Sequence, residues 1–266
     1  MKIPTLPIIL LAFAPIAASQ LLPPNDAGIR MGHLHLNVHD IEAQKKFWVD
    51  LFGAKPLARE GLTGVKLPGM LILFRQQDPT GTTEGTVLDH FGVKVIDLAD
   101  IVKRSQAAGF RTLPIHTGSE GFPNSYVYGP DGVKIELQQD TTLTTPVVSH
   151  HLHYWVEDPL ALRAWYVKTF GFTSGIRGRH QSADVPGMNL SFQPVKPQPP
   201  SGTKGRTLDH IGFEVRNLEA FCKNLEANGV KLDSPYRKLP NLGIALAFLT
   251  DPQGVFIELT EGLEQC

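Results

Sequence analysis

Four stretches of the chain repeat one arrangement of apolar and polar positions. They read HLHLNVHD, HFGVKVID, HLHYWVED and HIGFEVRN, and they begin at His33, His90, His151 and His210. In each stretch a valine follows the histidine by five positions, and an acid or amide follows it by seven. Side chains alternate between the two faces of a strand. Each stretch therefore predicts a strand with one apolar face and one face that carries histidine.

Each repeated stretch leads into an amphipathic segment that ends at a glycine. These segments are IEAQKKFWVDLFG, LADIVKRSQAAG, PLALRAWYVKTFG and LEAFCKNLEANG. Because Asp and Asn favour the N-cap and Gly favours the left-handed residue that ends a helix, each segment predicts a helix. The predicted N-caps are Asp40, Asp97, Asp158 and Asn217.

A last strand, entered through a turn with proline and glycine, completes each repeat. The four runs are LPGMLILF, YVYGPDGVKIEL, VPGMNLSF and FLTDPQGVFIEL. The chain thus predicts an α+β fold of four βαβββ modules. Turn-rich linkers occupy residues 76–86, 141–146 and 193–206. The middle linker divides the chain into two predicted halves of two modules each, residues 29–140 and 147–262.

Composition narrows the functional classes. Of the 266 residues, 42% are hydrophobic and 19% charged, which is typical of a globular protein. The formal net charge of -1 gives no electrostatic reason to expect a nucleic acid or an anionic membrane as a partner. The two cysteines are Cys222, inside a predicted helix, and Cys266, the last residue. We expect no disulfide between them and no cysteine-based metal site.

The first residues have the pattern of an export signal. MKIPTLPIILLAFAPIAASQ has one lysine, an apolar run and then small residues at a plausible cleavage point. We predict a signal peptide over residues 1–19, a mature chain beginning near Gln20, and a periplasmic or secreted protein. A membrane anchor is the alternative, but the run is interrupted by proline and is shorter than the roughly 20 residues that span a bilayer.

The polar faces of the strands bring candidate metal ligands together. In HLHLNVHD, His33, His35 and Asn37 share a face opposite the apolar one, and Glu136 in VKIELQ points away from its apolar neighbours in the same way. A sheet curved around this polar face would gather His33, His90 and Glu136. Two imidazoles and one carboxylate form the facial triad that holds non-haem iron with open positions.

The second half repeats this set. Its residues would be His151, His210 and Glu258. Buried histidines that only fill a core are the alternative, but an inward glutamate needs a partner to offset its desolvation. Pairing of modules between the halves is also open, and it would exchange the residues that complete each triad. Fe²⁺ or Mn²⁺ fits best, and Zn²⁺ or Ni²⁺ can occupy the same set.

With these residues the chain resembles the vicinal oxygen chelate superfamily of glyoxalases, bleomycin resistance proteins and extradiol dioxygenases. The resemblance covers about residues 30–262. It implies paired βαβββ modules that form two open β-barrel-like halves, with metal ligands on first and last strands, namely His33, His90, Glu136, His151, His210 and Glu258. It also implies a small-molecule substrate with vicinal oxygens and a monomer or homodimer.

The resemblance favours one branch of that superfamily. Glyoxalases usually place a fourth ligand on the last strand of the first module of a site, where this chain has Leu73 and Ser191. Extradiol enzymes carry a tyrosine ahead of the ligand glutamate and a nearby histidine, and Tyr126 and His116 stand at similar spacing in the first half. In the second half Phe248 replaces the tyrosine.

We therefore expect a metal-dependent enzyme most like an extradiol-type dioxygenase, with Tyr126 and His116 moving protons. The alternatives are a glyoxalase-like lyase or isomerase and a non-catalytic binding protein of the bleomycin-resistance type. Three further histidines are candidates to support the ligands from behind: His35, His153 and His180.

Overall fold

The computed structural model describes residues 21–195 and 201–266, so the predicted signal peptide lies outside the described residues. Module 1 contains β1 (Ile29–Val38), α1 (Ile41–Phe52), β2 (Lys55–Pro56), β3 (Gly64–Leu67) and β4 (Met70–Gln76). Module 2 contains β5 (Leu88–Val95), α2 (Leu98–Ala107), β6 (Arg111–Thr112), β7 (His116–Thr117), β8 (Pro123–Tyr128), η1 (Pro130–Gly132) and β9 (Lys134–Gln139).

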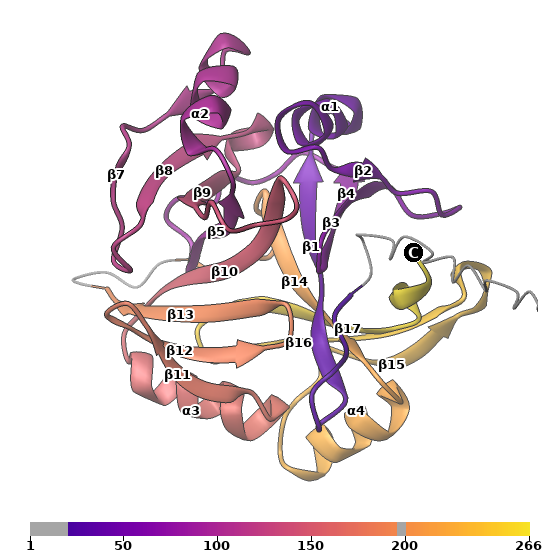
Figure 1. Ribbon diagram of the computed structural model, residues 1–266. Helices are drawn as coiled ribbons and strands as arrows, with labels where there is room; N and C mark the ends of the chain where they lie inside the picture. Colours follow the sequence, from indigo (N-terminus) through magenta and orange to yellow (C-terminus); the bar gives the residue numbers. More distant parts are fainter. Residues whose placement is uncertain (1–20, 196–200) are drawn as a thin grey trace, which may run out of the picture.

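The second half repeats the plan (Figure 1). Module 3 contains β10 (Val147–Val156), α3 (Pro159–Phe170), β11 (Thr173–Arg177), β12 (His180–Val185) and β13 (Met188–Pro194). Module 4 contains β14 (Leu208–Val215), α4 (Leu218–Ala227), β15 (Ser234–Leu239), η2 (Pro240–Leu242), β16 (Ile244–Thr250) and β17 (Phe256–Glu261), and η3 (Leu263–Gln265) follows it. The predicted fold class and the repeated module are confirmed.

The helices begin where the sequence predicts. Each predicted N-cap side chain accepts a hydrogen bond from a backbone amide in the first turn, which satisfies a group that the helix itself leaves without a partner. Asp40, for example, accepts from the amides of Glu42 and Ala43 at 2.8 and 3.1 Å. Two helices end directly at a left-handed glycine, Gly53 and Gly171.

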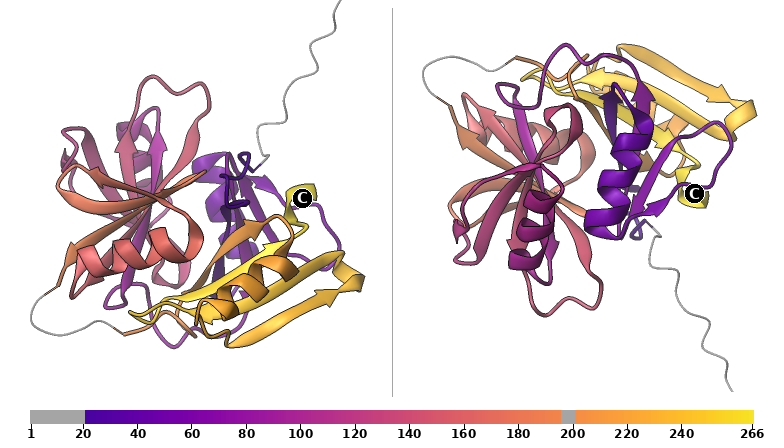
Figure 2. Two further views of the ribbon diagram at one scale, coloured as in Figure 1. Left: turned by 90° about the horizontal axis from the view of Figure 1, so that it is seen from below. Right: turned by 90° about the horizontal axis from the view of Figure 1, so that it is seen from above.

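The modules pair between the halves and not within them. One sheet has the order β15-β16-β17-β14-β1-β4-β3-β2, which joins modules 1 and 4. The other runs β11-β12-β13-β10-β5-β9-β8-β6 and joins modules 2 and 3, with β7 beside β8. We call these curved sheets barrel A and barrel B, and Figure 2 shows them side by side. The sequence left open whether modules pair within a half or between the halves, and the structure shows pairing between the halves.

Linker geometry accounts for this pairing. Residues 141–146, predicted to separate the halves, instead connect β9 to β10 within barrel B, where only β5 lies between those two strands. The other two linkers, residues 76–86 and 193–206, are longer. Each connects one barrel to the other, and the two linkers lie side by side. The amide of Thr80 donates to the carbonyl of Gly205 at 2.8 Å, and that of Val87 to Ser201 at 2.8 Å. Short connections keep consecutive elements adjacent, so modules 2 and 3 stay together.

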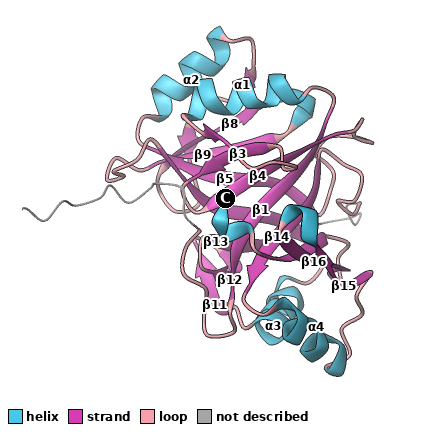
Figure 3. Ribbon diagram, turned by 90° about the vertical axis from the view of Figure 1, so that its right-hand side faces the viewer, coloured by secondary structure: helices cyan, strands magenta, loops and turns pink. Residues whose placement is uncertain are grey.

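The convex faces of both sheets bury a common apolar core. Leu34, Leu36 and Val38 of β1 are fully buried and belong to one cluster with residues of all four helices. Figure 3 shows α1 and α2 at the top of the molecule and α3 and α4 at the bottom, with the strands between the two pairs. The opposite, concave faces are thereby left to carry the histidines. Within the described residues, no helix is long and apolar enough to cross a bilayer.

A buried carboxylate fixes the turn that leads into β17. Asp251 accepts hydrogen bonds from the amides of Gln253 and Val255 at 2.8 and 2.9 Å and from the Tyr166 hydroxyl at 2.9 Å. Burial raises the pKa of Asp251 to about 6, although these hydrogen bonds oppose the rise. The folded state therefore holds the proton more tightly than the unfolded chain does.

Asp251→Asn is expected to flatten the pH dependence of stability. Because its pKa is raised, protonated Asp251 contributes to the free energy of unfolding. This contribution is complete below about pH 4 and is lost as the pH rises through about 6. Relative to the variant, the wild-type free energy of unfolding should fall by roughly 1–3 kcal/mol over that range. Urea unfolding at a series of pH values measures this difference. Parallel curves for the two proteins would contradict the assignment.

Candidate metal centres

Cluster A lies on the concave face of barrel A. It consists of His33 and His35 on β1, His210 on β14 and Glu258 on β17. Nε2 of His33 and Nε2 of His210 lie 2.9 and 3.0 Å from the same oxygen, Oε2 of Glu258. One ligand atom from each of the four residues lies within 4.8 Å of all the others. This spacing suits a single ion.

Cluster B occupies the same place in barrel B. It consists of His90 on β5, Glu136 on β9, and His151 and His153 on β10. Nε2 of His90 lies 2.8 Å from Oε2 of Glu136, and Nε2 of His151 lies 3.2 Å from it. All four side chains are buried. Clusters A and B thus repeat one arrangement on two sheets.

The predicted triads need one correction. Their residues all enter a cluster, but His33 and His151 exchange places: His33 joins the glutamate of module 4, and His151 joins that of module 2. The reason is the pairing of first strands, β1 with β14 and β10 with β5, both antiparallel. A pattern within one strand predicts which face a side chain occupies, but it contains no information about the neighbouring strand.

Both clusters require a glycine beneath a histidine ring. A Cβ atom added to Gly92 would lie 2.1 Å from Cε1 of His151, and one added to Gly212 would lie 2.0 Å from Cε1 of His33. Those distances are far inside van der Waals contact, so any larger residue would push the ring away. The repeated His-x-Gly of HFGVKV and HIGFEV is the sequence signal for this contact.

In each cluster an aspartate lies behind the histidine that comes from the same module as the glutamate. Nδ1 of His90 lies 2.7 Å from Oδ2 of Asp89, and Nδ1 of His210 lies 2.6 Å from Oδ2 of Asp209. Such a carboxylate holds the Nδ1–H tautomer and directs Nε2 at the ligand position. Our sequence reasoning missed both aspartates, although the repeated Leu-Asp-His offered a signal.

Protonation states in cluster B fit a divalent cation. Burial raises the pKa of Glu136, but hydrogen bonds with His151 and His90 outweigh it and hold the pKa well below the usual range. Burial lowers the pKa of His151 well below its ordinary value. For His90 burial acts downward, yet the hydrogen bonds with Asp89 and Glu136 raise the pKa. The donor set is therefore an ionised carboxylate with imidazole nitrogens directed at it.

Cluster A fits a cation for an additional reason. Both ring nitrogens of His35 are buried and have no hydrogen-bond partner among the described residues. Buried polar atoms without partners cost free energy, and a metal ion beside them would remove that cost. Burial lowers the pKa of His210, but Asp209 and Glu258 raise it to about 9. A positive charge is therefore stabilised at the point where an ion would sit.

The fourth ligand position holds no carboxylate in either barrel. Leu73 pairs in register with His35, as Glu258 does with Gly212 in the other module of barrel A. Ser191 pairs with His153 in the equivalent place. The expectation that these two residues occupy the fourth position therefore agrees with strand register.

A polar cavity of about 280 Å³ opens beside cluster B, and we call it cavity B. The predicted proton-transfer residues both line it. The Tyr126 hydroxyl donates to Oε2 of Glu136 at 3.2 Å, and the His116 ring stacks on that of Tyr126 with centroids 6.0 Å apart. Asn124 also donates to Glu136. His180, predicted to support the ligands, lines the cavity 5.0 Å from the ring of His153.

The concave face beside cluster A is apolar instead. Leu71 and Leu73, the register partners of His33 and His35, form a buried group with further apolar residues around the end of the chain. The other buried members are Leu21, Ile244 and Leu263. Arg59 links the segments around this group, because its guanidinium donates hydrogen bonds to the carbonyls of Leu242 and Gly262 at 2.6 and 2.7 Å.

The comparisons with known proteins agree with this geometry. A model of the Glyoxalase/Bleomycin resistance protein/Dioxygenase superfamily matches residues 30–137 and 148–259. The chain belongs to this superfamily. Each match spans two modules, so the repeat seen in the sequence is also a repeat of the superfamily domain. The vicinal oxygen chelate resemblance is thereby confirmed.

One known protein is similar in sequence to half of this chain, and two solved structures share its fold. The uncharacterized protein YaeR of Escherichia coli (strain K12) is 26% identical over 122 residues, which are 42% of this chain and 94% of that protein. Glyoxalase I from Zea mays superposes with a TM-score of 0.69 at 16% identity, over 89% of this chain and 94% of its own. A candidate dioxygenase from Bacillus subtilis gives 0.63 at 15% identity, over 87% and 85%.

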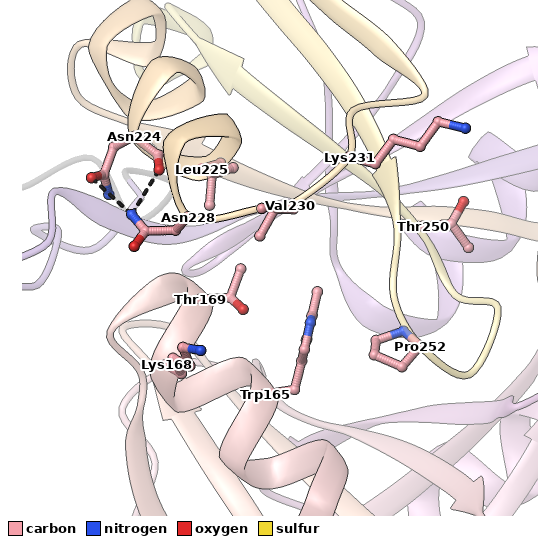
Figure 4. Close-up of a pocket in the computed structure, with 11 residues that line it drawn as sticks. Trp165, Lys168, Thr169, Asn224, Leu225, Asn228, Val230, Lys231, Thr250 and Pro252 are labelled. Carbon is pink, nitrogen blue, oxygen red and sulfur yellow. Dashed lines mark hydrogen bonds between the residues drawn. The ribbon is translucent and has the colours of Figure 1, made fainter.

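A separate groove of about 370 Å³ lies between α3 and α4 (Figure 4). Its side chains include Trp165 and Lys168 from α3 and Asn224 and Asn228 from α4. No histidine, cysteine, aspartate or glutamate lines this groove. The groove therefore lacks the ligands that a metal-dependent member of the superfamily needs.

Gly92→Ala and Gly212→Ala are expected to damage one cluster each. The new methyl group forces the His151 ring out of cluster B in the first variant and the His33 ring out of cluster A in the second. We expect Mn²⁺ binding to weaken roughly ten- to hundred-fold at the affected cluster alone. Calorimetric titration with Mn²⁺ measures both sites. Unchanged binding in both variants would contradict the role of the glycines.

Proposed function

We propose that the protein is an exported, divalent-metal-dependent enzyme with extradiol-type dioxygenase activity on a small substrate with vicinal oxygens. Its active site is cluster B, where His90, Glu136 and His151 would hold Fe²⁺ or Mn²⁺. When bound, the metal supplies Lewis-acid activation and open positions for two substrate oxygens and dioxygen. Superfamily membership and the chemistry of the ligand set support the metal dependence.

One observation carries the choice of reaction and of site. Tyr126 and His116 line cavity B beside a triad that has no fourth carboxylate. In barrel A the residue opposite the ligand Glu258 is Phe248, whereas in barrel B the residue opposite Glu136 is Tyr126. Only barrel B therefore combines a triad with this phenol, so the reaction is assigned to it and cluster A is assigned a non-catalytic role.

The chain's own residues suit proton transfer at this site. Burial raises the pKa of Tyr126, and Glu136 raises it further. The phenol consequently stays protonated and can donate a hydrogen bond to a substrate oxygen in place of Glu136. His116 is exposed and stacks on the same ring, so its imidazole can exchange a proton with solvent and with the substrate.

A glyoxalase-like lyase or isomerase is the second candidate. Such a reaction needs a base at the fourth ligand position, which Ser191 does not supply. The Ser191 hydroxyl accepts from Arg177 Nε at 2.7 Å and donates its single proton to Asn189 Oδ1 at 2.6 Å. A binding protein of the bleomycin-resistance type is the third candidate, and two complete sets of metal ligands weigh against it.

Export remains a proposal that rests on the apolar run within residues 1–20. Both candidate clusters consist of histidine and glutamate, so among the described residues no cluster ligand is a thiol that an oxidising compartment would oxidise.

Metal content of two alanine variants tests the assignment of the active site. His151→Ala removes a ligand from cluster B and His33→Ala removes one from cluster A. Each should lose close to one equivalent of Fe or Mn, measured by elemental analysis after purification without chelators. Oxygen uptake with catechols should be abolished by His151→Ala and retained by His33→Ala. Wild-type protein that takes up no metal, even after reconstitution, would refute the metalloenzyme.

Tyr126→Phe tests the proton-transfer step. The phenylalanine ring fills the same space but has no hydroxyl, so we expect kcat with catechols to fall roughly 10²-fold or more while metal content stays constant. Tyr128→Phe is the control, because that hydroxyl bonds to Glu84 at the surface. Equal rates for the two variants would remove Tyr126 from the mechanism.

A further inference from the structure

Cavity B is lined by three cationic side chains and two carboxylates. The cations are Lys134, Arg177 and Arg179, and the carboxylates are Asp89 and Glu136. A third carboxylate, Glu120, pairs with Arg177 from outside the lining. A divalent ion bound at cluster B would therefore make the surroundings of the cavity net positive.

The cations differ in whether they are already paired. Lys134 Nζ lies 2.6 Å from Oδ2 of Asp89, and Arg177 Nη1 lies 2.6 Å from Oε2 of Glu120. Arg179 is exposed and forms no ion pair with any described residue. It is thus the cation at this cavity whose charge is left for a ligand.

The hairpin tip that carries Arg179 is held in position. Gly178 packs against Ser119, where an added Cβ would lie 2.7 Å from Oγ. Glu120, in the loop between β7 and β8, accepts hydrogen bonds from Arg177 Nη1 at 2.6 Å and from Gln138 Nε2 at 2.9 Å. The tip between β11 and β12 is therefore fixed to the loop between β7 and β8 across the cavity. The backbone that carries Arg179 is thus preorganised, and the entropy lost on ligand binding is confined to the arginine side chain.

His180 completes a polar end of the cavity. Its side chain is largely buried and its ring has no hydrogen-bond partner among the described residues. Arg177 and Arg179 lie close enough to lower its pKa in addition to the effect of burial. The polar end consists of Arg179 and His180, with the Arg177 guanidinium behind them.

Barrel A shows that the fold does not require these residues. Arg177 pairs with His180 across the hairpin, and Arg59 pairs with Leu62 in the same place in barrel A. Counting along this hairpin puts Gly61 at the place of Arg179. On the last strands, Phe256 stands two residues before its glutamate, as Lys134 does in barrel B. Arg179 and Lys134 therefore have no charged counterpart at these places in barrel A, whereas Arg177 corresponds to Arg59.

We propose that the substrate of cavity B is a small carboxylic acid, whose carboxylate binds Arg179 and His180 while its vicinal oxygens face cluster B. The placement of the vicinal oxygens at cluster B rests on the proposed function, whereas the carboxylate site does not. A cavity of about 280 Å³ accommodates a compound with a single ring. Charge-assisted hydrogen bonds from Arg to a carboxylate are stronger than neutral ones, so the acid is distinguished from its ester.

The test uses the full mature chain loaded with Mn²⁺. It is titrated calorimetrically with 3,4-dihydroxybenzoate and with the methyl ester of that acid, which keeps both vicinal hydroxyls and removes the charge. We expect the acid to bind roughly ten-fold or more tightly than the ester. Arg179→Gln should reduce the affinity for the acid to that for the ester. Arg237→Gln, which removes one exposed arginine from β15 of barrel A, should retain the full preference.

Oxygen uptake measured with the same two compounds separates the two proposals. Equal affinities for acid and ester, or a preference that survives Arg179→Gln, overturn the carboxylate site and leave the proposed reaction intact. A preference that is lost in Arg179→Gln but comes without turnover supports the carboxylate site and removes the dioxygenase. Failure of both compounds to bind overturns the carboxylate site.

Discussion

Antiparallel pairing of the first strands is the constraint on which the rest of the structure depends. β1 pairs with β14 and β10 pairs with β5 in the same register, so His33 faces Gly212 and His151 faces Gly92. The absence of a side chain at each glycine admits the opposing imidazole ring. In each barrel this brings two histidines from different modules to one glutamate, and no single module could assemble that set.

The shared core and the duplicated clusters explain how the two sites can differ. The convex faces of both sheets and all four helices pack into one apolar cluster, so each barrel is needed to bury the other's surface. The residues on the concave faces do not form this shared core. Tyr126 opposes its glutamate in one barrel and Phe248 opposes its glutamate in the other. The fold can therefore retain two similar clusters while their surroundings differ, with a polar cavity beside cluster B and buried leucines beside cluster A.

Electrostatics at the two clusters follows from burial. Burial alone would raise the pKa of Glu258, but its hydrogen bonds with His210 and His33 outweigh burial, so the carboxylate remains ionised. Asp209 in turn holds His210. Each charge is thus compensated by a neighbour, and an ion placed among the ligand atoms would take over part of that role. Burying these charged groups costs free energy, but the resulting ligand sets are well suited to divalent metal ions.

The sequence by itself determined the repeated module, the helix boundaries and the face on which each histidine lies, because these depend on local periodicity and capping. Alternation along VKIELQ also placed Glu136 on the polar face of its strand, whereas Tyr126 was expected only from the resemblance to extradiol enzymes. Only the tertiary structure decided that His33 belongs with His210 and that His151 belongs with His90. Strand partnership depends on linker length and long-range packing, and alternation along one strand is the same whichever neighbour it has.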